Sequence, residues 1–290
     1  MIRAIVWGLG KEYNRYFNLL QYHEMTGNLH VVGVTANSNE YAVCGDYQFV
    51  PPNSINGNKY DVIIVTSAKN YKGIVENGKK LGISDELFIP VQVLEIPKID
   101  LNKYLRLKRS RLSIISQNCW GGLAYHYLGL QFTSPFINMS VSEDDMLKLM
   151  TNLKQYMDYD VRYKTKIYNE TLGRYYPVGT IGDVKLNFIH YTDFDEAVNI
   201  WEKRKNRINY DNLLFMAYTE DVKFADRFAR VGNCKKICFV PFEHQSDCIC
   251  YLPHREKEKP FWKMVTTSAI GKNYCYDIVD LLLGDEKDNG

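Results

Sequence analysis

One cysteine is set apart by its neighbours in the sequence. Cys119 follows the apolar run 113–116 and precedes Trp120, Gly121 and Gly122. At the start of a helix, the positive end of the helix dipole lowers the pKa of a thiol toward the reactive thiolate. The two glycines let backbone amides come close to a substrate, where they could form an oxyanion hole. The stretch therefore predicts a nucleophilic cysteine, with a buried structural thiol as the alternative.

A nucleophilic thiol needs a general base, and His190 is our candidate. The alternating run 184–191 predicts a strand that ends at His190, and open α/β sheets bind ligands beyond the carboxyl ends of their strands. Histidine titrates near neutral pH and commonly activates a thiol. His126, on the helix expected after Cys119, is a rival that is more often packed within its helix. Sequence separation leaves open whether His190 and Cys119 meet.

Five further polar residues could complete the site. Asp183 or Asp211 could orient the imidazole, and Asn118 could bind an oxyanion, although residues of these types are also common in turns. Arg204 and Arg207 face one side of a predicted helix and, with Asp211 nearby, could hold a phosphate or carboxylate of the substrate. A solvated helix end rich in basic residues is the alternative for the two arginines.

A cluster of possible zinc ligands occurs in the carboxyl-terminal part of the chain: Cys234, Cys238, Cys248, Cys250, His244 and His254. Their spacing departs from paired Cys-x-x-Cys knuckles, and Cys238 falls within an apolar strand-like run. We therefore predict no metal site.

Residues 1–108 alternate strand-like and helix-like runs, which predicts a parallel, doubly wound sheet. The strands are expected at 2–10, 29–37, 60–68 and 86–94, and helices at 11–25 and 71–82. The pattern predicts a Rossmann-like domain of the nucleotide-binding type. The charged run after Pro97 reads as a connector.

The first strand of this domain ends in an incomplete dinucleotide fingerprint. Gly8 and Gly10 are present, but Tyr13 stands at the third glycine position. The second strand ends at Asn37, without the acidic residue that would bind a ribose hydroxyl. Helix amides at Lys11 could still receive a phosphate. The turn therefore identifies no cofactor, and a purely structural role is the alternative.

The same alternation restarts in residues 109–290. Strands are expected at 111–116, 184–191, 212–218 and 235–242, helices at 121–129, 142–157, 193–207, 220–230 and 274–284, and a loop or hairpin at 175–183. We expect two Rossmann-like, three-layer α/β domains with mostly parallel sheets, the second of which carries Cys119.

Composition limits the partners that can be expected. Net charge is +2, from 36 Lys and Arg against 34 Asp and Glu, so nothing favours nucleic acid or an anionic membrane surface. We expect no signal peptide and no membrane span. The 7 cysteines are irregularly spaced, which favours free thiols in the cytoplasm. The oligomeric state remains open.

Three stretches of the second domain, 113–139, 176–191 and 201–215, resemble a bacterial family of uncharacterised proteins associated with exopolysaccharide or capsule biosynthesis. The first domain resembles the small Rossmann-type module that precedes several sugar-modifying enzymes. The layout around Asn118 and Cys119 is similar to papain-like cysteine enzymes and to a capsule-pathway acyltransferase group. These resemblances imply a saccharide or other small-molecule substrate.

The hypothesis from the sequence is therefore thiol-dependent acyl transfer or hydrolysis in cell-surface polysaccharide biosynthesis. Cys119 would be the nucleophile and His190 the base, and Trp120 could stack on a sugar. Two alternatives remain open. One is a glycosyltransferase that uses a nucleotide-sugar and the two arginines, and the other is a non-enzymatic carbohydrate-binding or assembly protein.

Overall fold

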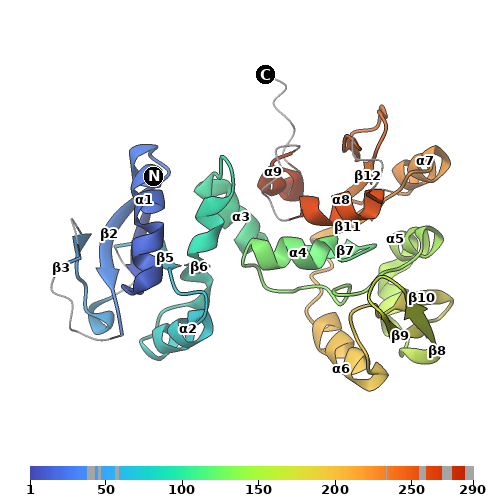
Figure 1. Cartoon of the computed structure of the whole chain (residues 1–290), viewed down its shortest axis with the longest axis horizontal. Helices are drawn as coiled ribbons and strands as arrows, with labels where there is room; N and C mark the ends of the chain where they lie inside the picture. Colours follow the sequence, from blue (N-terminus) through green and yellow to red (C-terminus); the bar gives the residue numbers. More distant parts are fainter. Residues whose placement is uncertain are drawn as a thin grey trace. The chain divides into compact units, whose positions relative to one another are not determined.

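The chain forms two compact α/β units, Met1–Arg109 and Ser110–Gly290, each built around a parallel sheet as the sequence predicts (Figure 1). The computed structural model describes residues 1–37, 43–44, 47–55, 59–232, 234–254, 259–269 and 276–284. The boundary expected from sequence lies one residue from the division between these units. Residues 274–275, the start of the expected last helix, fall outside the described part.

The first unit has a four-stranded parallel sheet in the order β2-β1-β5-β6. Its apolar strands are buried on both faces, as parallel strands covered by helices must be. Its elements are β1 (Ile2–Trp7), α1 (Lys11–Met25), β2 (Leu29–Thr35), β3 (Val43–Cys44), β4 (Tyr47–Gln48), the 3₁₀ turn η1 (Pro52–Ser54), β5 (Val62–Val65), α2 (Tyr71–Lys80), η2 (Asp85–Leu87), β6 (Phe88–Pro90), η3 (Val91–Glu95) and α3 (Leu101–Ser110).

The expected connector after Pro97 is instead helix α3. Its charged residues alternate with Leu101, Tyr104 and Leu107, whose side chains are fully buried. This apolar stripe at helical spacing packs in a core, which a solvated linker does not do. The connector prediction was wrong because it relied on the many charged residues of the segment and overlooked the apolar residues at helical spacing among them.

The second unit has a four-stranded parallel sheet in the order β13-β12-β11-β7 and a separate antiparallel sheet in the order β10-β9-β8. Its elements are β7 (Ser113–Ser116), α4 (Trp120–Tyr127), α5 (Glu143–Asp158), β8 (Arg162–Asn169), β9 (Arg174–Ile181), β10 (Val184–Asn187), α6 (Phe194–Lys205), β11 (Leu213–Tyr218), α7 (Val222–Arg230), β12 (Lys236–Val240), β13 (Ile249–Tyr251), α8 (Phe261–Ser268) and α9 (Ile278–Leu283).

Alternate residues of the parallel sheet face two different layers. Ile115, Phe215 and Cys238 join a large core with α5, α6, α7 and the antiparallel sheet. On the other face, Trp120 of α4 packs on Phe239 of β12. Helices α4 and α8 lie side by side on that face (Figure 1). This sheet is therefore the middle of three layers, and α4 leaves its edge strand at the carboxyl end.

The antiparallel sheet was only partly foreseen. The stretch expected as a loop or hairpin contains β9, which forms a hairpin with β10 across a turn at Gly182. Strand β8 pairs with β9 along its length and is almost wholly exposed. The strand expected to end at His190 ends at Asn187, and His190 lies in the turn that follows. This turn begins at Phe188, whose amide donates to the Pro177 carbonyl, 3.1 Å away.

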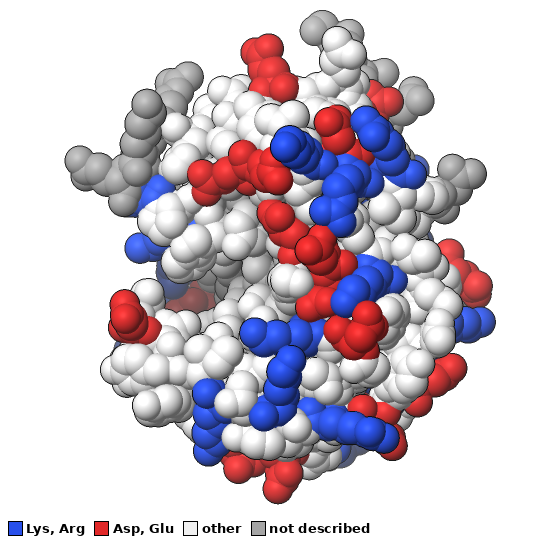
Figure 2. Space-filling model, turned by 90° about the vertical axis from the view of Figure 1, so that its right-hand side faces the viewer, with Lys and Arg blue, Asp and Glu red and all other residues white. Residues whose placement is uncertain are grey.

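Charges of both signs share the surface. Lys and Arg are interspersed with Asp and Glu on the face shown in Figure 2. No helix in the described part of the chain has the length and hydropathy needed to cross a membrane. The mixed charge of that face does not distinguish it as a surface for a charged partner.

Candidate functional site

The Cys119 thiol and the His190 imidazole meet at the carboxyl end of β7. The distance between Cys119 Sγ and His190 Nε2 is 3.1 Å. The cysteine is half-buried and the histidine exposed, so the pair is open to solvent on one side. A thiol in hydrogen-bond contact with an imidazole is the arrangement that thiol-based nucleophilic catalysis requires.

The segment 136–141 links the two residues. The Val141 amide donates to the carbonyl of Gln117 at the end of β7, 3.0 Å away, and the His190 amide donates to the Asn138 carbonyl, 3.3 Å away. Gly122 allows this segment to approach α4, because a Cβ at that position would lie 3.1 Å from the Ile137 side chain. One short segment thus fixes the distance between two residues that are 71 positions apart.

Burial favours the neutral forms of both groups. It raises the pKa of Cys119 to about 11, and the lowered pKa that the sequence suggests is therefore wrong. The protein that covers part of the imidazole also lowers the pKa of His190, although the residue as a whole is exposed, and the nearby Arg174 charge lowers it further. The resting pair is then a neutral thiol that donates to a neutral imidazole. Histidine is in the form that can accept the thiol proton at neutral pH.

The first amides of α4 are already occupied. The Trp120 amide donates to Asn118 Oδ1 at 2.9 Å, and the Gly121 amide donates to Ser116 Oγ at 3.1 Å. These two amides therefore do not form the expected oxyanion hole. Because Asn118 Oδ1 accepts from Trp120, its Nδ2 is the remaining donor, and it is buried without a hydrogen-bond partner among the described residues.

Trp120 and the two glycines serve packing. The Trp120 side chain is fully buried, and its Nε1 donates to the Tyr276 hydroxyl at 3.2 Å. It cannot stack on a sugar, so that expectation was wrong. A Cβ on Gly121 would lie 2.9 Å from Ser116 Cβ, so glycine is needed for α4 to pack closely against β7.

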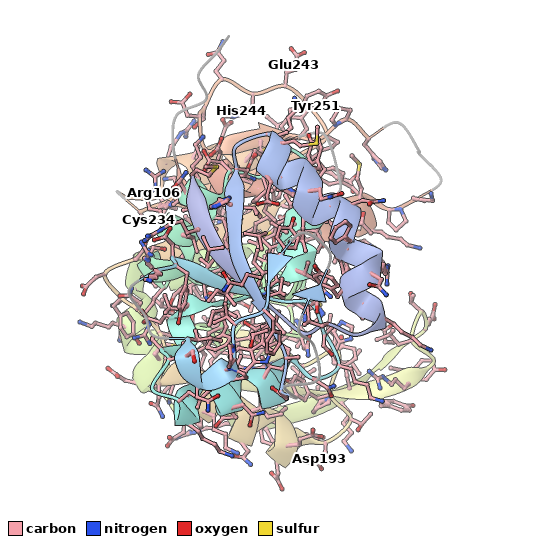
Figure 3. The ribbon with its side chains drawn as sticks, turned by 90° about the vertical axis from the view of Figure 1, so that its left-hand side faces the viewer. Arg106, Asp193, Cys234, Glu243, His244 and Tyr251 are labelled. Carbon is pink, nitrogen blue, oxygen red and sulfur yellow. The ribbon has the colours of Figure 1, made fainter. Side chains whose placement is uncertain are left out.

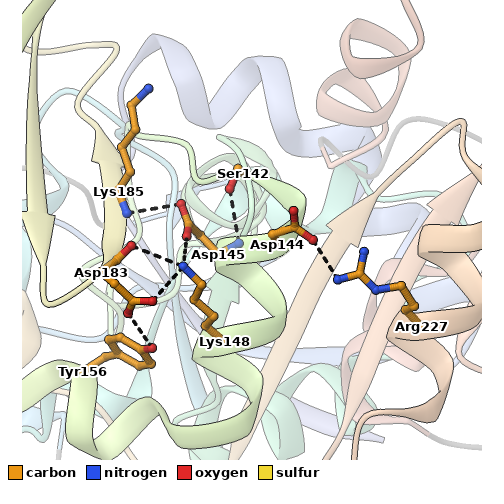
Figure 4. Close-up of polar contacts among 8 residues, drawn as sticks. All are labelled: Ser142, Asp144, Asp145, Lys148, Tyr156, Asp183, Lys185 and Arg227. Atoms are coloured by element: carbon orange, nitrogen blue, oxygen red, sulfur yellow. Dashed lines mark hydrogen bonds and ion pairs between the residues drawn. The ribbon is translucent and has the colours of Figure 1, made fainter.

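Asp183 belongs to a different cluster, shown in Figure 4. Its carboxylate forms an ion pair with Lys148 at 2.9 Å and accepts from the Tyr156 hydroxyl at 2.8 Å. Lys148 also pairs with Asp145 at 3.0 Å. Asp183 precedes β10 whereas His190 follows it, so the strand separates them. Asp183 is therefore not placed to orient the imidazole, contrary to our expectation.

Replacing Asp183 with asparagine is expected to leave the chemistry of the Cys119–His190 pair unchanged, since the charge that is lost pairs with Lys148 in a solvent-exposed cluster. The rate of Cys119 alkylation by iodoacetamide in the variant and the wild type measures this. A tenfold slower reaction in the variant, beyond the effect of a surface ion pair, would restore Asp183 to the site.

The arginine pair divides between two locations. Arg204 Nη1 donates to the hydroxyl of Tyr191 at 3.1 Å, and its guanidinium lies over the Phe132 ring. Arg207 and Asp211 are exposed and lie just before β11, whose first residue pairs with the first residue of β7. They are therefore at the amino edge of the sheet, opposite Cys119, which contradicts a binding role shared with it.

Two residues that the sequence did not suggest lie near the pair. Arg174, the first residue of β9, donates through Nη2 to the His190 carbonyl at 3.4 Å. Tyr218 ends β11, the strand beside β7, and the Cys119 thiol is among the groups that raise its pKa, after burial and two glutamates. The position of Tyr218 at a strand end was a usable signal, whereas nothing in the sequence distinguishes Arg174.

Neither His126 nor His244 is paired with Cys119 by a hydrogen bond in the described part of the chain. His126 is exposed on α4. His244 contacts Asp226 at 3.3 Å and, with Glu243 and Tyr251, lies at the opposite end of the second unit from Asp193 in Figure 3. Among side chains that the structure describes, no three metal-ligating groups come together.

The contacts of the glycine turn after β1 are those of a turn that packs within the first unit. Gly8 has a φ of +112°, and a Cβ there would lie 2.7 Å from Thr66 Oγ1. Gly10 precedes α1 with open space around it, and Lys11 is exposed. Tyr13 is buried in the core at the position of the third fingerprint glycine. Phosphate binding by Gly8, Gly10 and Lys11 stays a prediction.

Both parts of the chain match known protein families. Residues 1–89 match the C2185-like N-terminal domain. An uncharacterized protein of Haemophilus influenzae is 32% identical over 116 residues, which cover 40% of this chain and 53% of that protein, so the match spans about half of the relative. A dehydrogenase (MviM) from Clostridium difficile is similar with 14% identity and a TM-score of 0.23, over 64% of this chain and 68% of that one. Residues 91–282 match the domain of unknown function DUF1919, and the chain belongs to that family.

Proposed function

We propose that this protein is a cysteine-dependent acyltransferase or hydrolase, with Cys119 as nucleophile and His190 as general base. The observation that carries the proposal is the 3.1 Å contact between Cys119 Sγ and His190 Nε2, at the carboxyl end of a parallel strand. Such strand ends are where open α/β sheets bind their ligands.

In the first half-reaction, Cys119 Sγ attacks the carbonyl carbon of the acyl donor. The thiol proton passes to His190 Nε2 while the bond between sulfur and carbon forms. His190 then gives this proton to the leaving group, which departs as an alcohol, thiol or amine and leaves a thioester on Cys119. A general base suits the neutral resting pair, because the thiol is protonated at neutral pH.

In the second half-reaction, an acceptor hydroxyl or water attacks the thioester and gives its proton to His190. The bond between carbon and Cys119 Sγ breaks, and the sulfur regains the proton. The acylated acceptor or free acid leaves. Water as acceptor makes the reaction a hydrolysis, and a saccharide hydroxyl makes it a transfer.

Oxyanion stabilisation is assigned to Asn118 and to the helix that follows it. Asn118 Nδ2 is a donor without a partner in the described region, and an unsatisfied buried donor carries a desolvation cost that a substrate oxygen would relieve. The positive end of the α4 dipole favours negative charge at the same place. This assignment replaces the amides of Trp120 and Gly121.

The biological setting is assigned to exopolysaccharide or capsule biosynthesis on the resemblance of three stretches of the second unit. A saccharide hydroxyl is then the acceptor of the acyl group. A glycosyltransferase that uses a nucleotide-sugar is the competing assignment. It would bind sugar nucleotides tightly and would have no need of thiol chemistry.

The test is acylation of the full-length protein by p-nitrophenyl acetate at neutral pH, followed by mass mapping of its peptides. We expect the acetyl group on Cys119 well before it appears on Cys234, which is also half-buried but lies before β12, at the amino end of the strands. Equal labelling of the two cysteines, or labelling of Cys234 alone, contradicts the proposal. Tight nucleotide-sugar binding in a titration, together with an unlabelled Cys119, would favour the glycosyltransferase.

A further inference from the structure

Arg174 brings a positive charge to the Cys119–His190 pair. It is the first residue of β9, opposite Asn169 in the ladder, and so lies at the tip of the β8–β9 hairpin. Its Nη2 donates to the His190 carbonyl at 3.4 Å. Its charge also contributes, after burial, to the lowered pKa of His190, in keeping with that contact.

Among the residues that the structure describes, this charge has no anionic partner. No carboxylate of the described part of the chain lies within ion-pair distance of Arg174, whereas Arg3 pairs with Asp61 and Arg227 with Asp144. Arg174 is half-buried, and its Nε is buried without a hydrogen bond to any described residue. A partly desolvated cation is costly unless a ligand supplies the missing negative charge.

The chemistry of the missing partner follows from the guanidinium. Its planar donors match the paired oxygens of a carboxylate or phosphate. The Arg204 guanidinium offers a contrast within the same unit, since a tyrosine hydroxyl and a phenylalanine ring already occupy it. Of these two arginines, Arg174 is the one whose guanidinium has no side-chain partner among the described residues.

We propose that Arg174 binds a negatively charged oxygen group of the acyl substrate, a carboxylate or phosphate, next to the carbonyl that Cys119 attacks. The substrate class is then an anionic acyl compound. This inference rests on the proposed function, because it assumes that Cys119 is the reacting group. It makes Arg174 a specificity-determining residue rather than part of the proton transfer.

The experiment compares two reagents of nearly the same size, anionic iodoacetate and neutral iodoacetamide, on the full-length protein. Each forms a bond between Cys119 Sγ and carbon with loss of iodide, and the thiol proton passes to His190. We expect Arg174→Gln to lower the ratio of the iodoacetate rate to the iodoacetamide rate by about tenfold, as loss of a nearby charge in a half-buried site should. Arg174→Lys keeps the charge and should retain part of the preference.

The matched control is Arg162→Gln. Arg162 is exposed at the far end of the same hairpin, where it pairs with Thr180. Its replacement should therefore leave the ratio of the iodoacetate rate to the iodoacetamide rate unchanged. In wild type, protection against iodoacetate by inorganic phosphate more than by acetate identifies the anion as a phosphoryl group, and the reverse identifies a carboxylate.

The outcomes separate the two proposals. A normal iodoacetamide rate with an unchanged ratio in Arg174→Gln overturns the anion site and leaves Cys119 as nucleophile. If Cys119 reacts with iodoacetamide no faster than Cys234 does, the proposed function itself is overturned. The iodoacetamide rate of the variant also reports whether its site has kept its fold.

Discussion

His190→Ala is expected to slow the acylation of Cys119 by p-nitrophenyl acetate by about 10²- to 10⁴-fold at pH 7, the range over which general bases contribute. The reason is the neutral resting state of the pair. Burial raises the pKa of the thiol to about 11, so very little thiolate exists at pH 7 without a base to take the proton. The rate is measured from release of nitrophenolate, with labelling of Cys119 verified by mass.

The pH dependence gives this prediction a second readout. The pKa of His190 lies below its ordinary value of 6.5, by burial first and by the Arg174 charge second. The imidazole is therefore neutral at pH 7 and loses its capacity to accept a proton as the pH falls through this lowered pKa. The wild-type rate should fall on that acidic limb, and the limb should vanish in His190→Ala.

His126→Ala is the control for this experiment. His126 is exposed on α4, the helix that begins after Cys119, and makes no contact with the thiol. Its removal should leave both the rate at pH 7 and the acidic limb in place. If His190→Ala behaves like His126→Ala, the 3.1 Å contact is a structural hydrogen bond and not a catalytic one.

Trp120→Ala is expected to destabilise the second unit by about 3–5 kcal/mol, as truncation of a fully buried tryptophan does. The side chain packs on Phe239 with ring centroids 5.5 Å apart, and the hydrogen bond from its Nε1 to the Tyr276 hydroxyl is also lost. The measurement is the free energy of unfolding of the full chain in urea, followed by circular dichroism.

Trp262→Ala is the matched control for the tryptophan. Trp262 lies on α8 and is 43% exposed, so its loss should cost about 1 kcal/mol or less. Equal stability of Trp120→Ala and wild type would mean that α4 is not anchored by this ring.

The α/β class and most parallel strands were predictable from sequence, because buried strands give continuous apolar runs between helix signals. The start of α5 shows the same agreement, since Ser142 caps it through the Asp145 amide as its residue type predicts. Strand β8 escaped prediction because an exposed edge strand has no apolar face. Its polar residues are typical of both edge strands and loops.

For the site, residue type and strand order predicted the cysteine and the histidine but not their surroundings. Whether the pKa of Cys119 is raised or lowered depends on how much protein covers the thiol. The residues around it in the sequence do not reveal this. Arg207 and Asp211 could have been excluded, since residues before a strand lie at its amino end. Arg174 could not have been found, because a hairpin tip acquires its neighbours only through folding.

Strand β8 contributes no residue to the large core of the second unit, although it supports the hairpin tip that carries Arg174. Substitutions in β8 should therefore change little in the stability of the unit, unlike those in β9, whose Ile181 lies in the core. The link through segment 136–141, by contrast, is held in a packed interior. A substitution in β8 can thus alter the surroundings of Arg174 while leaving the core intact, whereas a substitution in segment 136–141 disturbs the core and the spacing of Cys119 and His190 together.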